Sequence, residues 1–182
     1  MSGQTTPLLR GFPPVIDDDA EVLILGSFPS AQSLAVHQYY ANPRNAFWRI
    51  TSELFDFDPN APYDVRLAAL RSHGVSLWDV LHGCRRIGSA DSAIDPQSLV
   101  VNNFGVLFAN YPRITRVYFN GAKAAQLFRR LAGERDWPVD YQRLPSTSPA
   151  HVMPPGAKLA AWQAISASIA SAAQPGEAGR RQ

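Results

Sequence analysis

Apolar and polar positions along the chain form short buried-type runs that alternate with longer amphipathic segments. Four runs rich in apolar and aromatic residues predict strands at 21–27, 75–81, 116–120 and 139–144. Segments with apolar residues every three or four positions predict helices at 42–55, 63–72, 95–108, 121–131 and around 159–169. Strands that alternate with helices predict an α/β fold, in which a parallel sheet is covered on both faces.

Local signals place the ends of several predicted helices. Asn42-Pro43 and Asp95-Pro96 each offer an N-cap residue followed by proline at the first helical position. Gly74 follows the segment 63–72 and is expected to end that helix in the left-handed conformation.

The composition is that of a soluble globular protein. The chain has 182 residues, of which 46% are hydrophobic and 18% charged, so it is long enough to bury a sizeable core. No repeat or change of composition divides it. We therefore expect one domain over residues 12–173, with flexible tails at 1–11 and 174–182.

The balance of charge permits a nucleic-acid partner without requiring one. The net charge is only +2, yet nearly all the cations are arginines, with lysine at positions 123 and 158 alone. Arginine suits bidentate recognition of phosphate. A high arginine content can equally reflect genome composition, so both interpretations stay open.

The chain has few cysteines and histidines and no long apolar segment, and this excludes several classes of protein. Cys84 is the only cysteine, which excludes an intrachain disulfide and a Cys-rich zinc or iron–sulfur site. The four histidines lack metal-ligand spacing, the first residues lack the character of a signal peptide, and no apolar run approaches a membrane span. We expect a cytoplasmic protein without a metal, a cofactor or a membrane partner.

Three loops follow predicted strands and carry the candidate chemistry. They occupy residues 26–48, 82–94 and 145–156, and in a parallel sheet such loops converge at one edge. The first loop is unusually aromatic, with Phe28 and the pair Tyr39-Tyr40. Exposed rings at the carboxyl end of a strand indicate a flat ligand.

The first loop resembles motif one of the uracil-DNA glycosylase superfamily, most closely its mismatch-specific branch. That branch reads Gly-Ile-Asn-Pro-Gly and then Phe-Ala-His-Pro-Ala-Asn-Arg-Phe-Trp. This chain reads GSFPS at residues 26–30 and YANPRNAFW at residues 40–48, with the same spacing. The segments LWDVLHGCRRIGSADSAI, VYFNGAKAAQLF and LPSTSPAH resemble the hypoxanthine-DNA glycosylase family of that superfamily, over roughly residues 12–170.

The resemblance implies a three-layer α/β sandwich with a central four-stranded parallel sheet. It implies a monomeric DNA glycosylase that flips hypoxanthine, which is deaminated adenine, out of double- or single-stranded DNA and hydrolyses its glycosidic bond without a cofactor. Two alternatives stay open: a uracil or broader deaminated-base glycosylase, and a catalytically silent module that binds damaged DNA.

Phe28 is a departure from the superfamily pattern, because other branches place a water-positioning Asp or Asn at this position. A phenyl ring neither orients nor deprotonates water, so another group must organise the attack on C1′. The transition state resembles an oxocarbenium ion, and stabilisation of the leaving group can supply much of the catalysis. The N-terminus of the helix predicted to begin at Asn42 would favour a departing purine anion.

Four residues are candidates for catalysis. Asn45 is the first choice for contact with the base or the water, against a purely local hydrogen bond, whereas Asn42 is interpreted first as a helix cap. In motif two, Ser148 stands where other branches have an anion-stabilising His. His151 is close enough to replace it, with a solvent-facing loop residue as the alternative.

The remaining candidates are divided between the base and the DNA. Tyr40 is expected to stack on the flipped base unless it packs in the core, Phe28 is a second stacking candidate, and Asp79 either reads the base or forms a buried salt bridge with Arg85 or Arg86. The predicted base-binding residues are Gly26, Ser27, Phe28, Pro29, Tyr40 and Asp79. The predicted DNA-binding residues are Ser30, Arg44, Arg85, Arg86, Ser146, Thr147, Pro149, Val152 and Met153, with Val152 or Met153 as the wedge that enters the duplex.

Overall fold

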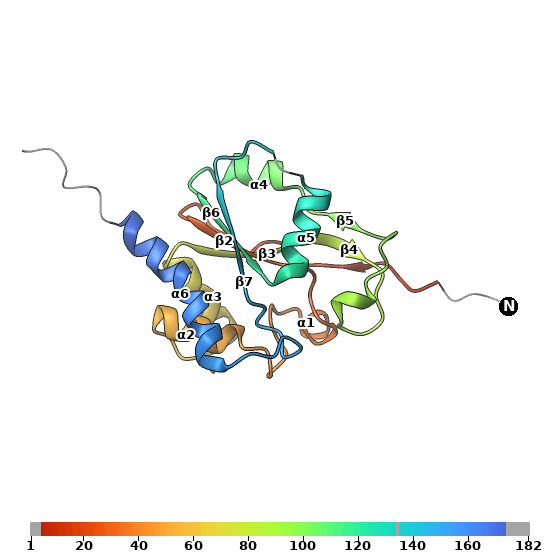
Figure 1. Cartoon of the computed structure of the whole chain (residues 1–182), viewed down its shortest axis with the longest axis horizontal. Helices are drawn as coiled ribbons and strands as arrows, with labels where there is room; N and C mark the ends of the chain where they lie inside the picture. Colours follow the sequence, from red (N-terminus) through yellow and green to blue (C-terminus); the bar gives the residue numbers. More distant parts are fainter. Residues whose placement is uncertain (1–4, 134, 174–182) are drawn as a thin grey trace, which may run out of the picture.

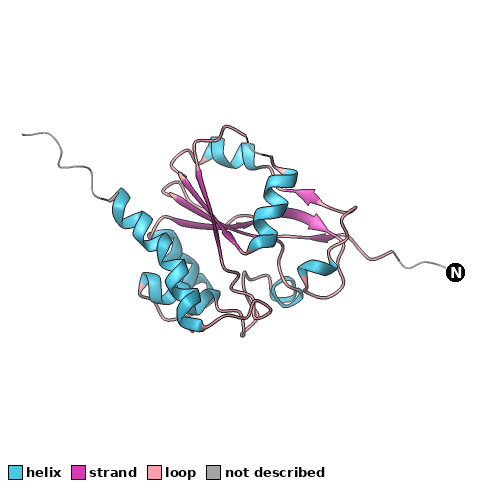
Figure 2. Cartoon of the chain, in the orientation of Figure 1, coloured by secondary structure: helices cyan, strands magenta, loops and turns pink. Residues whose placement is uncertain are grey.

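The computed structural model describes residues 5–133 and 135–173, so the predicted tail at 174–182 lies outside the described residues. A four-stranded sheet forms the centre of the fold, with helices on both sides (Figures 1 and 2). Its strands lie in the order β3-β2-β6-β7, and every neighbouring pair is parallel. The strands are β2 (Val22–Gly26), β3 (Val75–Asp79), β6 (Arg116–Asn120) and β7 (Asp140–Leu144).

Two groups of helices cover the sheet and confirm the predicted α/β architecture. The helices α2 (Phe47–Phe55), α3 (Tyr63–Ser72) and α6 (Pro155–Ala172) pack on one face. The helices α4 (Phe104–Asn110) and α5 (Ala122–Leu131) pack on the other (Figure 1). Within the described residues, no helix combines the length and the apolar character needed to cross a membrane.

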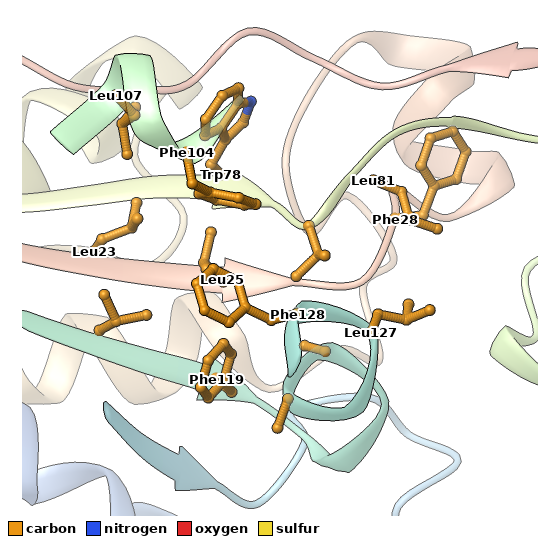
Figure 3. Close-up of a cluster of buried hydrophobic side chains, with 14 of the residues drawn as sticks. Leu23, Leu25, Phe28, Trp78, Leu81, Phe104, Leu107, Phe119, Leu127 and Phe128 are labelled. Carbon is orange, nitrogen blue, oxygen red and sulfur yellow. The ribbon is translucent and has the colours of Figure 1, made fainter. Parts of the chain in front are cut away.

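The central strand β2 is buried on both faces, which explains its continuous apolar sequence. Leu23 and Leu25 point into the cluster formed with α4 and α5 (Figure 3), while Val22 and Ile24 join the cluster formed with α2, α3 and α6. After β2 the chain builds β3 on one side and later β6 on the other. The gap between the ends of β2 and β6 is where open α/β sheets bind ligands.

A second, antiparallel sheet includes residues 9–10, which lie within the lead predicted to be flexible at 1–11, of which the structure describes 5–11. Its strands are β1 (Leu9–Arg10), β4 (Leu81–Cys84) and β5 (Val100–Val101). Leu9 pairs with Cys84 and Arg10 pairs with Gly83. A side chain at Gly83 would place its Cβ 3.0 Å from the carbonyl oxygen of Leu9, so the close pairing depends on this glycine.

The predicted start of α2 at Asn42-Pro43 is wrong by one turn of helix. The helix begins at Phe47, and residues 42–45 form a turn in which the N–H of Asn45 donates to the carbonyl oxygen of Asn42 at 2.9 Å. The Asn42 side chain accepts the N–H of Arg44 at 3.0 Å. Asn before Pro initiates such turns as readily as it caps helices, so the local sequence was ambiguous.

The same ambiguity explains a second error, at Asp95-Pro96. The Asp95 carboxylate accepts the N–H of Gln97 at 2.9 Å and forms a turn, after which the chain enters β5. The helix α4 begins later, at Phe104, where the Asn103 side chain caps it by accepting the N–H of Val106 at 3.1 Å.

Two short helices in the loops were not predicted. The helix α1 (Ala31–Val36) lies inside the first loop and is capped by the hydroxyl of Ser30, which accepts the N–H of Ser33 at 3.1 Å. The 3-10 helix η1 (Asp91–Ala93) lies inside the second loop. By contrast, α3 lies where predicted and is followed by Gly74 at φ 72°.

Candidate active site

A cavity of about 560 Å³ opens at the carboxyl edge of the parallel sheet. The three loops predicted to converge do so here, since residues 26–30, 89–92 and 146–151 all line the cavity. Most predicted site residues contribute to this lining: Gly26, Ser27, Phe28, Pro29, Ser30, Tyr40, Asn42, Asn45, Asp79, Ser146, Thr147, Ser148, Pro149 and His151. Five predicted residues lie outside it: Arg44, Arg85, Arg86, Val152 and Met153.

Gly26 and Asp79 form the floor of the cavity. They are register partners at the ends of the adjacent strands β2 and β3. A Cβ on Gly26 would lie 2.5 Å from Asp79 Oδ1 and 3.3 Å from the hydroxyl oxygen of Tyr40. Only glycine therefore leaves room for the carboxyl group and the phenol to lie where they do.

Asp79 carries a buried carboxyl group that has no protein partner for one of its oxygens. The residue is 5% exposed, and Oδ2 makes no hydrogen bond to any described residue. The pKa of Asp79 is raised to about 7, chiefly by burial and also by the charge of Asp91, while the charge of Arg86 opposes the rise. Near neutral pH, the neutral carboxyl group is therefore substantially populated and offers an O–H donor beside a carbonyl acceptor.

Arg86 joins the first loop to the second. Its guanidinium donates from Nε to the carbonyl oxygen of Gly88 at 2.8 Å and from Nη2 to the carbonyl oxygen of Pro29. The residue is 4% exposed, which favours a structural role for the guanidinium over the predicted phosphate contact. Among the described residues, no salt bridge joins Asp79 to Arg85 or Arg86, so that predicted alternative is not found.

The ring of Phe28 packs in the core. It belongs to the cluster that also contains Leu81 (Figure 3), and the guanidinium carbon of Arg86 lies 5.2 Å from the centre of the ring. This position favours packing over the predicted stacking on a base. It also removes the ring from any part in handling water.

Tyr40 combines the two interpretations that the sequence left open. Its ring stacks on Phe47 with centroids 3.9 Å apart and an interplanar angle of 17°, while the half-buried residue also lines the cavity. The backbone has φ 55°, an uncommon left-handed conformation for tyrosine. Burial raises the pKa of the Tyr40 hydroxyl, as does the charge of Asp79, so the phenol stays neutral. One face of the ring is thus packed, and stacking on a base requires the other.

The N-cap position of α2 is Ala46, and the side chain that accepts the first N–H of the helix belongs to Asn45, not to Asn42. The Oδ1 atom of Asn45 accepts the N–H of Phe47, the first residue of α2, at 2.9 Å. That contact assigns the amide orientation, because only the oxygen can accept from an N–H. The Asn45 Nδ2 group makes no hydrogen bond to a described residue and belongs to a side chain that lines the cavity.

Asn120 ties the motif-two loop to the sheet, and its role was missed by the sequence analysis. Its Nδ2 donates to the Thr147 hydroxyl and its Oδ1 accepts the Thr147 N–H, both at 2.9 Å. The carbonyl oxygen of Thr147 then accepts the N–H of Ala46 at 3.0 Å. Thr147 is 1% exposed, which favours a structural role for its side chain, and its contact with DNA stays a prediction.

The other motif-two residues lie at the rim or support the turn. The Ser146 hydroxyl accepts the N–H of Ser148, and the Ser148 hydroxyl accepts the N–H of Ala150. His151 is exposed and lines the cavity, while its backbone carbonyl accepts from the Lys158 ammonium group at 3.0 Å. Val152 is 91% exposed, which leaves it free to enter DNA as predicted, whereas Met153 is half-buried.

Asp91 is a second carboxylate in the cavity, and sequence reasoning missed it. The residue begins η1, lines the cavity and accepts a hydrogen bond from the Ser27 hydroxyl at 2.7 Å. Its position as the only acidic residue between Asp79 and Asp95 could have drawn attention to it. Within the described part of the chain, no three His, Cys, Asp or Glu side chains gather in a way that could hold a metal ion.

Comparison with known proteins agrees with this arrangement of loops and sheet. A family model described as the uracil DNA glycosylase superfamily matches residues 13–166. A Methanosarcina acetivorans protein named hypoxanthine DNA glycosylase is 35% identical over 159 residues, which cover 86% of this chain and 96% of the relative. A protein of the same name from Methanosarcina barkeri is 40% identical over 118 residues, covering 64% of this chain and 73% of the relative.

A solved structure shares the fold. The solution NMR structure of a candidate uracil DNA glycosylase from Methanosarcina acetivorans matches with a TM-score of 0.77 and 33% sequence identity. The match covers 90% of this chain and 99% of that protein.

Proposed function

The chain belongs to the uracil-DNA glycosylase superfamily, and we propose that within it the chain is a hypoxanthine-DNA glycosylase. The reaction is hydrolysis of the N-glycosidic bond of deoxyinosine in DNA, which leaves an abasic site. The matched segments cover 73% and 96% of the lengths of the two relatives that bear this name. The structural observation that carries the proposal is the buried carboxyl group of Asp79, a residue of the cavity lining whose Oδ2 has no hydrogen-bond partner among the described residues.

Asp79 matches the edge of hypoxanthine that distinguishes it from adenine. Hypoxanthine presents an N1–H donor beside the O6 acceptor, and a neutral carboxyl group presents an acceptor beside an O–H donor. Two parallel hydrogen bonds satisfy both partners, so the cost of leaving Asp79 Oδ2 unpaired disappears when the base binds. Uracil has a comparable N–H and carbonyl edge, and this shared feature is the reason to keep a uracil or broader deaminated-base glycosylase as the second candidate.

Asn45 is suited to stabilising the leaving group. Its Oδ1 is engaged by Phe47 N–H, which leaves the two donors of Nδ2 for an acceptor in the cavity. As the glycosidic bond breaks, negative charge develops on the purine, and a positioned donor at that point lowers the barrier. The N-terminal end of α2 adds a partial positive charge at the same place.

The rim supplies the contacts with DNA. Val152 is a large apolar side chain held in solvent beside the cavity, as expected of a wedge that fills the space left by a flipped nucleotide. Arg44, Pro149 and His151 are exposed and remain candidates for contacts with the strand. We propose that the protein acts as a monomer on double- and single-stranded DNA in the cytoplasm, without a cofactor.

The proposal is tested with end-labelled oligonucleotides that contain one deoxyinosine, one deoxyuridine or no modified base. After incubation with the protein, hot alkali cleaves DNA at abasic sites. We expect cleavage at deoxyinosine in duplex and single strands. Cleavage at deoxyuridine as well would establish the broader glycosylase, and binding without any cleavage would establish a silent binding module.

A matched pair of variants connects the activity to the cavity. Asp79→Leu replaces a buried carboxyl group by an apolar group of similar size, so the protein should remain folded and lose cleavage. Asp140→Leu makes the same change at an exposed position on β7 and should cleave as the wild type does. Full activity in Asp79→Leu would remove Asp79 from base recognition while leaving the activity established.

A further inference from the structure

Hydrolysis needs a group that accepts a proton from the attacking water, and the expected position does not supply one. The ring of Phe28 is packed in the core beneath Arg86. The Oδ1 atom of Asn45 is engaged by the N–H of Phe47, and an amide is in any case too weak a base to take a proton. A proton acceptor for the water is therefore to be sought elsewhere in the cavity, and it would act together with stabilisation of the leaving group.

Asp91 is placed to supply this group. It comes from η1 in the second loop, and its Oδ1 accepts the hydroxyl proton of Ser27 at 2.7 Å. Ser27 directly follows Gly26, so this hydrogen bond holds the carboxylate against motif one, beside the floor of the cavity. One hydrogen bond from Ser27 leaves the other lone pairs of the carboxylate able to accept from water.

Asp79 supplies an independent sign that a polar ligand occupies this cavity. It comes from β3, is 5% exposed and lines the same cavity as Asp91, and its Oδ2 has no hydrogen-bond partner among the described residues. The two carboxyl groups have different surroundings, since Asp79 is deeply buried whereas Asp91 is half-buried and bonded to Ser27. Two carboxyl groups in unlike environments commonly divide recognition or acid catalysis from base catalysis.

We propose that Asp91 is the general base of the reaction and that Ser27 is the positioning residue that holds it. This inference rests on the proposed glycosylase function. As the water oxygen forms its bond to C1′, one water proton passes to Asp91 and the C1′–N9 bond breaks. The purine leaves with the electron pair of that bond and takes up a proton from solvent, to which Asp91 later returns its own.

Other charged and titratable groups surround Asp91. Asp79 lies on β3, Cys84 ends β4 and Arg86 follows it, and each interacts electrostatically with Asp91 or shares a partner with it. Arg86 is the cation of this group, and its buried guanidinium offsets part of the negative charge of Asp91.

Asp91→Asn separates a catalytic role from a structural one. The amide oxygen of Asn still accepts the Ser27 hydroxyl, so the loop should stay in place, but the group no longer takes a proton. The single-turnover rate on duplex deoxyinosine should fall roughly 100-fold or more, in the range of general base catalysis. Affinity for a duplex that contains 2′-fluoro-deoxyinosine, whose glycosidic bond resists hydrolysis, should stay within twofold.

The matched control is Asp95→Asn. Asp95 lies in the same loop, is exposed, and uses its side chain to accept the N–H of Gln97, which Asn can also do. The same loss of charge there should leave the rate unchanged. A rate for Asp91→Asn within threefold of the wild type would overturn the inference. The proposed function would still stand, because the wild-type protein in the same assay reports it separately.

Chemical rescue gives a second readout. In Asp91→Gly the space of the carboxylate is empty, and added formate should restore part of the lost rate without improving the wild type. Ser27→Ala should slow the wild type but have no further effect in Asp91→Asn, since Ser27 acts through Asp91. A slow Asp91→Gly variant that formate does not restore would assign the loss to structure and overturn the catalytic role.

Discussion

Asn120 forms two hydrogen bonds with Thr147, one with the backbone N–H and one with the side-chain hydroxyl, each 2.9 Å long. Thr147 passes the constraint on, because its carbonyl oxygen accepts the N–H of Ala46 just before α2. The end of β6, the motif-two loop and the turn that contains Asn45 are thereby fixed to one another. The position of the Asn45 amide thus depends on a residue that makes no contact with it.

Removal of the two Asn120 hydrogen bonds should therefore reduce both the stability of the fold and the rate of base removal. Asn120→Ala leaves the buried N–H and hydroxyl of Thr147 without partners, at a cost of about 1–3 kcal/mol in the free energy of unfolding. Thr147→Val removes only the side-chain bond and should cost less. Urea unfolding and single-turnover kinetics measure the two effects. If Asn120→Ala removes the base at the wild-type rate, the loop keeps its position without these hydrogen bonds.

Asn45 should show separable structural and chemical roles. Asn45→Asp keeps the oxygen that caps α2, so the free energy of unfolding should change by less than about 1 kcal/mol. The variant loses the Nδ2 donors and places a negative charge where the purine becomes an anion, so the rate should fall roughly 100-fold or more. Asn42→Ala, which loses only a turn hydrogen bond, serves as the control and should retain turnover. An active Asn45→Asp protein would contradict the proposed role.

The carboxyl group of Asp79 should make stability depend on pH. Its pKa is raised to about 7 in the folded protein, above the ordinary value near 4, so the folded state binds more protons than the unfolded state between pH 4 and 7. The stabilising contribution is complete below pH 4 and is lost as the pH rises through 7. The difference in free energy of unfolding between wild type and Asp79→Asn should shift in that sense across this window. A constant difference would show that Asp79 has an ordinary pKa.

The same titration should appear in the kinetics. If the neutral carboxyl group binds the base, the wild-type kcat/KM on deoxyinosine should decline as the pH rises above 7, whereas Asp79→Asn should lose this decline. Asp91→Asn should move the decline to lower pH, because the charge of Asp91 helps to raise the pKa of Asp79. Parallel pH profiles in all three proteins would rule out this role.

Arg44 and Arg86 should respond differently to removal. Arg44 is exposed at the start of the turn before α2, so Arg44→Ala should reduce the slope of log K against log salt by about 0.9 if the side chain contacts one phosphate. Arg86→Ala removes the bonds to Gly88 and Pro29 and should lower the melting temperature instead. Binding titrations at several salt concentrations and thermal melts distinguish them. An unchanged slope for Arg44→Ala would exclude that contact.

Val152 should matter for duplex DNA and not for single strands. A wedge fills the space of a nucleotide flipped from a stacked duplex, whereas an unpaired strand needs no such help. Val152→Ser should therefore slow cleavage of duplex deoxyinosine at least tenfold more than cleavage of the single strand. Val65→Ser changes an exposed valine on α3, outside the cavity lining, and should affect neither substrate. Equal losses on both substrates would exclude the wedge.

The sequence was informative wherever a feature depends on neighbours along the chain. The uninterrupted apolar run of β2 predicts a strand covered on both faces, and the structure buries Val22 to Gly26 completely enough to confirm it. The strand ends then predict which loops meet, and they do meet at the cavity. Asn45 and Tyr40 were predicted as site residues from the motif spacing and Asp79 from its place near the end of a predicted strand, and all three line the cavity.

The features that the sequence could not supply depend on partners far away in the chain. One example is the hydrogen bond between Ser27 and Asp91, and another is the pair of hydrogen bonds between Asn120 and Thr147. Both join segments that are distant in the sequence, so no local pattern predicts them. Arginine is usually exposed, and the burial of Arg86 depends on a carbonyl oxygen of another loop, that of Pro29. The predicted helix starts at Asn42-Pro43 and Asp95-Pro96 were wrong for a different reason, because Asn-Pro and Asp-Pro occur in turns as readily as at helix caps.

Because position 26 has no side chain, substitutions at positions 26 and 79 should be coupled during evolution. An alanine at 26 would press on the carboxyl group of Asp79 and the hydroxyl of Tyr40, so it can persist only if one of those residues becomes smaller. We expect homologous chains that keep an acid at 79 to keep glycine at 26. Chains that lose the acid are released from that requirement, and in them position 26 should vary. Alignment of many relatives would therefore reveal the binding of the base as a correlation between two positions that are distant in sequence.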